Sequence, residues 1–94
     1  MNVEIKKEGS KTFVTLNGRI DTTNANQFQA DINTLMYDEN PDIEMDCTNM
    51  EYTSSQGLRL FLMLQKTVSS KGGSMVMCNM KPQVKEVFDI TGFS

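Results

Sequence analysis

Apolar and polar residues alternate along the first two segments of the chain. VEIKKEG (3–9) starts with this alternation, and TFVTLNG (12–18) repeats it after a Gly-Ser turn. A period of two is typical of a half-buried strand, and two such runs joined by a short glycine-containing turn predict a β-hairpin. Phe13, Val14 and Leu16 are its candidates for the core.

The spacing changes to that of a helix after Asp21. Apolar residues then recur at intervals of three, four, three and one, which places them on one helical face: Ala25, Phe28, Ile32, Leu35 and Met36. Asp21, Thr22 and Thr23 are residue types that cap helix N-termini, and Asn40-Pro41 is a stop signal. The pattern predicts a helix from about Thr23 to Tyr37.

A short strand and a long helix are predicted next. Ile43, Met45 and Cys47 alternate strictly with polar residues, and residues 49–51 are expected to form a loop. The helix, near 56–70, has a broad apolar face and ends at a Gly-containing segment, as helix C-termini often do. The residues of this face are Leu58, Leu60, Phe61, Leu62, Leu64 and Val68.

A further strand and a third helix complete the pattern. SMVMCNM (74–80) is the strand, and Pro82 opens a helix near 82–91, since proline suits the first turn. Val84, Val87, Phe88 and Ile90 form its apolar face.

The resulting order, β-β-α-β-α-β-α, predicts an α/β fold. Alternating strands and helices after the hairpin imply right-handed crossovers and neighbouring parallel strands. We expect a mixed sheet of about four strands with helices packed largely on one face, anchored by Phe61, Leu62 and Phe88. The 94 residues form one domain, 1–94. The chain stops straight after the third helix, which leaves room for a missing C-terminal strand or tail.

The charge balance argues against nucleic acid as a partner. The net charge is -3, and the densest basic spot is only Lys6-Lys7, whereas phosphate neutralisation needs a concentrated basic face. No apolar run approaches the roughly 20 residues that span a bilayer, and the N-terminus lacks the apolar segment of a signal peptide. We therefore expect a cytoplasmic protein without direct membrane insertion.

The chain has no histidine. This excludes Ser-His-Asp and Cys-His catalysis and histidine-based zinc sites. Cys47 and Cys78 have no CxxC partner and are expected to be small core residues. A small enzyme built on Asp21, Asp46 and Glu51 is an alternative, but surface charge is the simpler account of each. No catalytic residue, metal site or cofactor is predicted.

YTSSQGLRLFLMLQK (52–66) places two serines, Ser54 and Ser55, where the second helix begins. A serine in this position is most often an N-cap, worth about 1 kcal/mol. Its hydroxyl also lies near free backbone N–H groups and the positive end of the helix dipole, which can hold a phosphate. No base nearby in the sequence could activate the hydroxyl as a nucleophile. The serines are therefore candidates for a cap, a phosphorylation site, or both.

Three segments carry a family's motifs in order. LNGRIDTTNANQF (16–28) resembles L-x-G-x-(L/I/V)-D followed by a small-residue helix start. MDCTNMEYTSSQGLRLFLMLQK (45–66) resembles D-(L/C)-(S/T)-x-(L/V)-x-(F/Y)-(I/M/T)-D-S-(S/T)-G-L-G. GGSMVMCNMKPQVKEVFDITGF (72–93) resembles a closing G-G-x-(L/M)-x-(L/V)-x-x-(L/M)-x-P-x-V segment. Over nearly its whole length the chain thus resembles the STAS domain of bacterial anti-sigma factor antagonists.

The resemblance implies partner switching. Such proteins bind an anti-sigma factor, a serine kinase of the GHKL type, and so free a sigma factor. The kinase ejects the antagonist by phosphorylating it, and a PP2C-type phosphatase restores it. By position, the acceptor serine is Ser55, and Ser54, in place of the usual Asp, is a rival. The implied partner-binding residues are Asp21, Thr22, Thr23, Met50, Tyr52, Thr53, Ser54, Gln56, Gly57 and Arg59.

Two alternatives stay open. The same fold could serve as a stand-alone STAS subunit of a lipid-transport or other membrane-associated complex, without phosphorylation. Met50 precedes the serines in the predicted loop, and it is either a soft contact for a partner or buried beneath that loop.

Overall fold

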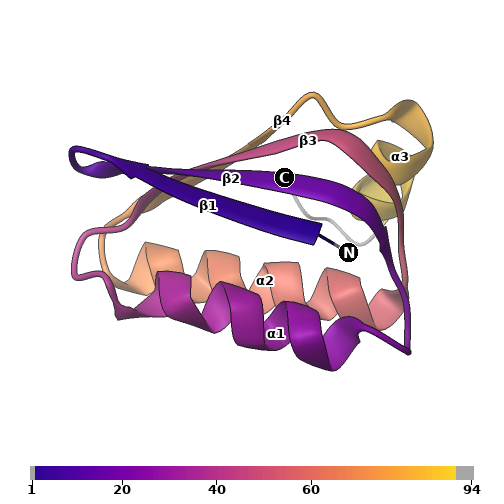
Figure 1. The fold of residues 1–94 in the computed structure, drawn as a ribbon, viewed down its shortest axis with the longest axis horizontal. Coiled ribbons are helices and arrows are strands. Elements are labelled where there is room, and N and C mark those ends of the chain that lie inside the picture. The colour runs from indigo at the N-terminus through magenta and orange to yellow at the C-terminus, as the bar shows by residue number, and fades with distance from the viewer. Residues whose placement is uncertain (1, 91–94) are drawn as a thin grey trace.

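A four-stranded mixed sheet forms one layer of the molecule (Figure 1). The computed structural model describes residues 2–90. The strands lie side by side in chain order: β1 (Asn2–Glu8), β2 (Lys11–Ile20), β3 (Asp42–Thr53) and β4 (Ser74–Cys78). β1 is antiparallel to β2, and β2, β3 and β4 are parallel. The predicted hairpin, mixed sheet and order of elements are confirmed.

Two of the helices lie beneath one face of the sheet, and the third lies at the right-hand end of the strands in this view (Figure 1). They are α1 (Ala25–Asn33), which continues as the 3₁₀ turn η1 (Thr34–Tyr37), α2 (Ser55–Ser70) and α3 (Pro82–Ile90). One phenylalanine from each helix joins a chain of buried rings. The centroid of Phe61 lies 5.1 Å from that of Phe28 and 5.5 Å from that of Phe88. These tilted pairs link the three helices into one core.

The anchors of the core are largely those predicted. Phe61 and Phe88 are buried, as expected, but Leu62 is only half-buried. Phe61 and Leu64 lie one helical turn apart on the sheet-facing side of α2, so Leu62 falls on its flank. Burial also raises the pKa of the Cys47 thiol to about 12, which keeps it protonated in the core.

Phe13 is not part of this core. Val14 and Leu16 are buried against the helices, so the strand alternation turns Phe13 to the opposite face of the sheet. There it is half-buried beneath the Lys11 ammonium, 5.6 Å from the ring centroid. Cys78, also predicted to be a core residue, is likewise half-buried.

β3 is much longer than predicted, because the expected loop at 49–51 is strand. Pairing with β2 shifts register between Thr15 and Asn17 and again between Gly18 and Arg19. At each shift β3 has one more residue than β2, which is the arrangement of a β-bulge. The bulges stretch the interval between inward-facing residues from two to three, so that the buried positions run from Cys47 to Met50 and Thr53.

The first helix begins later than predicted. α1 starts at Ala25 and its N-cap is Asn24, whose side chain makes no capping hydrogen bond. The predicted cap residues Asp21, Thr22 and Thr23 lie instead in the turn before it. The side chains of Asp21 and Asn24 are occupied in bracing that turn, as described below.

Candidate functional site

Two strand-to-helix turns meet at the carboxyl ends of β2 and β3. Ile20, the last residue of β2, pairs with Thr53, the last residue of β3. The backbone N–H of Ser54 donates to the Ile20 carbonyl at 2.8 Å. The Asp21–Thr23 turn therefore lies beside the Ser54–Ser55 turn, although more than 30 residues of sequence separate them.

Of the two candidate serines, Ser54 is the one that caps helix α2. Its backbone is extended, and its Oγ accepts a hydrogen bond from the Gly57 N–H at 3.2 Å. Its carbonyl accepts the first helical bond, from Leu58 N–H at 3.0 Å. The Ser54 side chain is thus buried and engaged, with only 9% of the residue exposed.

Gly57 is fixed by close packing. A Cβ atom on this residue would lie 2.5 Å from Thr53 Oγ1 and 2.6 Å from Ile20 Cγ2. Because a real Cβ requires more room than this, only glycine lets the first turn of α2 approach the strands so closely. Gly57 therefore sets the position of the helix start relative to β2 and β3.

Ser55 differs from its neighbour in being open to solvent. It is the first residue of α2, and both it and Gln56 are exposed. Its N–H lies ahead of the first intrahelical bond, at the positive end of the helix. The two serines therefore have separate environments: one closes the helix end, and the other presents its hydroxyl at the surface.

The Asp21 carboxylate holds the neighbouring turn. It accepts from the Thr23 N–H at 2.9 Å and from the Thr23 hydroxyl at 2.5 Å. The Thr23 hydroxyl, followed by the Thr23 N–H, lowers the pKa of Asp21 below its ordinary value. The carboxylate is consequently ionised at neutral pH, which places a fixed negative charge on the turn beside Ser54.

Two residues of this region escaped the sequence analysis. The Asn24 side chain accepts from the Asp21 N–H at 2.9 Å and donates to the Arg19 carbonyl at 2.8 Å. The Arg19 guanidinium lies over the Tyr52 ring, 4.8 Å from its centroid. Asparagine after a run of cap-type residues was an available signal for Asn24, whereas the pairing of Arg19 with Tyr52 depends on the bulged register of β3.

The predicted partner-binding residues divide into two groups. Thr22, Thr23, Tyr52, Gln56 and Arg59 are exposed, and Asp21 is half-buried. Met50, Thr53, Ser54 and Gly57 are buried. Of the two alternatives left open for Met50, burial holds and a surface contact does not: the bulges turn this residue inward, and its side chain belongs to the core.

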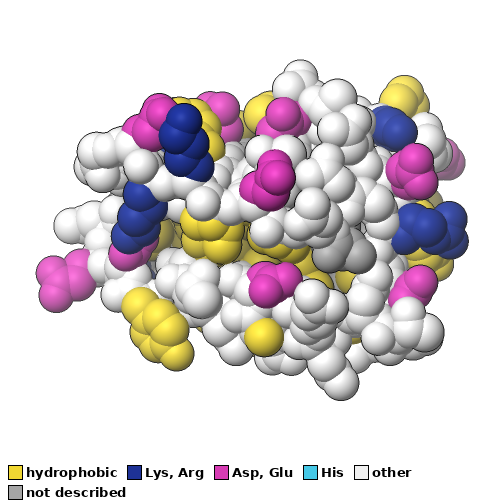
Figure 2. Space-filling view, in the orientation of Figure 1, with side chains coloured by type: hydrophobic (Ala, Val, Ile, Leu, Met, Phe, Trp, Pro, Cys, Tyr) yellow, Lys and Arg dark blue, Asp and Glu magenta, His cyan; other side chains and the backbone are white. Residues whose placement is uncertain are grey.

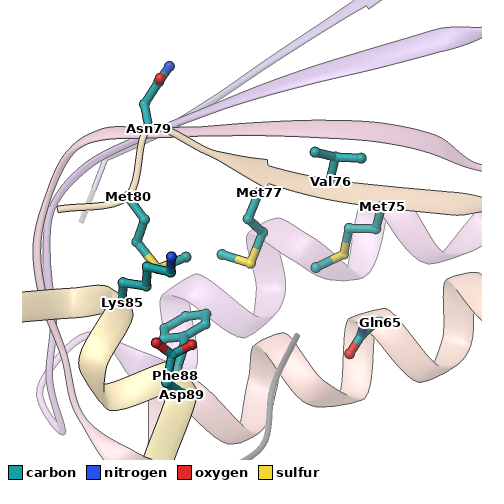
Figure 3. Close-up of a pocket in the computed structure, with 9 residues that line it drawn as sticks. All are labelled: Gln65, Met75, Val76, Met77, Asn79, Met80, Lys85, Phe88 and Asp89. Carbon is teal, nitrogen blue, oxygen red and sulfur yellow. The ribbon is translucent and has the colours of Figure 1, made fainter. Parts of the chain in front are cut away.

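A separate cavity of about 530 Å³ lies between β4, α2 and α3 and is lined by none of the predicted site residues. Met75 and Met77 point from β4 toward α2, whereas Val76 and Asn79 point to the other side of the strand (Figure 3). Phe88 and Lys85 of α3 lie at its other wall (Figure 3).

The surface charges are mixed. On the face shown in Figure 2, Lys and Arg side chains are interspersed with Asp and Glu. Among residues 2–90, no three or more Cys, Asp or Glu side chains gather as metal ligands would. Within the same part of the chain, no helix has the length and apolar character needed to cross a membrane.

Comparisons with known proteins agree with the fold. The chain is 31% identical over 93 residues to BtrV of Bordetella bronchiseptica, a candidate anti-sigma factor antagonist, covering 99% of this chain and 80% of BtrV. It is 28% identical to the anti-sigma-B factor antagonist of Bacillus subtilis, covering 98% of this chain and 84% of that protein.

Solved structures share the architecture. The anti-sigma factor antagonist SpoIIAA in its unphosphorylated form aligns with a TM-score of 0.81 at 20% identity, covering 98% of this chain and 82% of SpoIIAA. The phosphorylated form of SpoIIAA, a Bacillus cell fate determinant, aligns with a TM-score of 0.77 at 19% identity, covering 98% and 85%. The family model for the STAS domain matches residues 2–94. The chain therefore belongs to the STAS-domain family of anti-sigma factor antagonists, which are regulators rather than enzymes.

Proposed function

We propose that the protein binds an anti-sigma factor with serine kinase activity of the GHKL type, and that phosphorylation of Ser55 ends this binding. A PP2C-type phosphatase removes the phosphate and restores the binding form. The single observation that supports this assignment is the contrast between the two serines. Ser55 presents its hydroxyl on the first turn of α2, whereas the Ser54 oxygen is buried and occupied by Gly57 N–H.

In the proposed phosphoryl transfer, this chain provides only the accepting hydroxyl. The Ser55 Oγ attacks the γ-phosphorus of ATP, the bond to ADP breaks, and the hydroxyl proton passes to a base. The kinase supplies that base, because this chain has no histidine and the nearby Asp21 carboxylate has a lowered pKa and is a weak acceptor of protons. The substrate contributes an accessible hydroxyl on a rigid helix start, in the cytoplasm where ATP is available.

The contact surface consists of the exposed residues around Ser55. Thr23 and the half-buried Asp21 stand on the turn after β2, Tyr52 on β3, and Gln56 and Arg59 on α2 itself. A phosphate adds a charge of about -1.5 to -2 to this surface. The phosphate would lie close to the turn that carries the ionised Asp21. To bind, it would have to lose its hydration at an interface that is complementary to a neutral serine hydroxyl. Each 1.4 kcal/mol of this penalty lowers the affinity tenfold.

The test begins with a pull-down from native lysate, followed by identification of the captured kinase. Wild type, Ser55→Ala and Ser54→Ala are then incubated with that kinase and ATP, and the products are mapped by mass spectrometry. We expect phosphate on Ser55 in the wild type and in Ser54→Ala, and none on Ser55→Ala. Ser54→Ala should lose about 1 kcal/mol of stability through its cap, so the reaction is run well below its melting temperature.

Two results would overturn the proposal. One is phosphorylation of Ser55→Ala at the wild-type rate, which would move the acceptor to another residue. The other is capture of a membrane-transport complex with no kinase, which would support the alternative role of a stand-alone STAS subunit.

A further inference from the structure

The chain has only two arginines: Arg19 on β2, paired with Tyr52 of β3, and Arg59 on α2. Arg19 is committed to Tyr52, with its guanidinium 4.8 Å from the ring centroid. Arg59 is exposed on α2 and has no ion pair or hydrogen bond to any residue between 2 and 90. Arg19 is thus held against an aromatic ring, whereas the Arg59 side chain is available for a new contact.

Arg59 lies four residues after Ser55 on the same helix. Residues i and i+4 are neighbours on a helix surface, with Cβ atoms about 5–6 Å apart. Both are exposed, while Gly57 and Leu58, which lie between them in the sequence, are buried, so the pair shares the outward side of the first turns. An anion N-terminal to a cation at this spacing is the favourable order.

The guanidinium matches a phosphate better than it matches a hydroxyl. Its planar, positively charged fork can donate two parallel hydrogen bonds to phosphate oxygens. Ser54, the residue before Ser55, is neutral and buried at the cap, so it brings no negative charge of its own to this helix start. Arg59 also stands where the family motif quoted for residues 45–66 has glycine, so the motif itself does not contain this pair.

We propose that Arg59 binds the phosphate of phosphorylated Ser55 within the same helix. Phosphorylation then changes the contact surface twice: it adds the phosphate, and it withdraws the one arginine that was free to meet a partner. This inference concerns the regulation of the site in the proposed function and rests on phosphate being carried by Ser55.

The experiment installs phosphoserine at position 55 during translation, by suppression of a stop codon, so that no kinase is required. ³¹P NMR then follows the second ionisation of the phosphate, which has its midpoint near pH 6 in the absence of neighbours. The variants are Arg59→Gln, Arg59→Lys and, as the matched control, Arg19→Gln. The other charges on the adjoining segments, Asp21 and Glu51, are the same in every protein.

Loss of Arg59 should raise the midpoint by about 0.3, because an exposed i,i+4 ion pair is worth about 0.3–0.5 kcal/mol. Arg59→Lys should recover part of this, and Arg19→Gln should change the midpoint by less than a third as much. The Arg59 effect should shrink in 1 M salt, which screens an exposed pair.

Equal midpoints in the wild type and Arg59→Gln, or equal shifts for Arg59→Gln and Arg19→Gln, would overturn the inference. Neither result depends on which serine the cellular kinase modifies. The NMR midpoints therefore test the contact between Arg59 and the phosphate, and the mass-spectrometric mapping separately tests the proposed function.

Discussion

At the scale of single residues, Gly57 is the position most intolerant of change near the site. Gly57→Ala should lower the free energy of unfolding by about 1–3 kcal/mol, the usual cost of overpacking, because the added Cβ would lie 2.5 Å from Thr53 Oγ1. Urea unfolding measures the loss. Gln56→Ala, at the exposed neighbouring position, is the control and should change stability little; equal losses in both variants would contradict the packing account.

Asp21 gives a second prediction at this scale, a dependence of stability on pH. Hydrogen bonds from Thr23 lower the pKa of its carboxyl from 3.8. A lowered folded pKa stabilises the protein above the unfolded value, and the stabilisation is lost as the pH falls through the folded value. The stability difference between wild type and Asp21→Asn should therefore be constant near neutral pH and shrink below about pH 3.8.

Urea unfolding at a series of pH values measures this difference. Thr23→Val removes the hydroxyl that contributes most to the lowered pKa, so it should reproduce part of the Asp21→Asn effect. A stability difference that stays the same from neutral pH down to acid would show that the turn does not hold the carboxylate.

At the scale of elements, α3 packs onto the core through Val84 and Phe88, of which Phe88 is the larger side chain. Phe88 is 2% exposed and packs 5.5 Å from Phe61. Phe88→Ala should cost about 3–5 kcal/mol. Ile90→Ala, on the same helix but 78% exposed, should cost less than about 0.5 kcal/mol. Similar melting temperatures for the two variants would mean that α3 is not anchored by Phe88.

Helix positions were more predictable than strand length. The apolar period of α2 and the Pro82 start of α3 follow from local rules, and the structure has both. The full length of β3 does not, because it depends on bulges that arise only in pairing with β2. A period-two pattern ends at Cys47, and nothing local signals that burial resumes at Met50 with a period of three.

In the candidate site, too, some features follow from the local sequence and others depend on strand pairing. The capping role of Ser54 could be predicted from its residue type and its place before an apolar helix. The proximity of Asp21 to Ser54 required the parallel pairing of β2 and β3, and the contact between Arg19 and Tyr52 required its register. The sequence therefore predicted the candidate site residues, whereas the strand pairing of the sheet determines which of them lie close together.

At the scale of the whole molecule, the proposed switch would require no large rearrangement. The core joins all three helices through Phe28, Phe61 and Phe88, and Ser55 lies outside it on the surface. A phosphate on this residue therefore alters the charge of the contact surface while the packed layers remain intact. On this account, circular dichroism spectra of the protein with and without phosphate on Ser55 should superimpose.

The most direct test of partner switching is the affinity of the captured anti-sigma factor for the protein with serine or phosphoserine at position 55, measured calorimetrically without ATP. The phosphorylated protein should bind at least tenfold more weakly, a loss of about 1.4 kcal/mol or more, and Ser55→Ala should bind as the unmodified protein does. Equal affinities for all three would contradict the account, because Ser55 would then lie outside the interface and serve only as the first residue of α2.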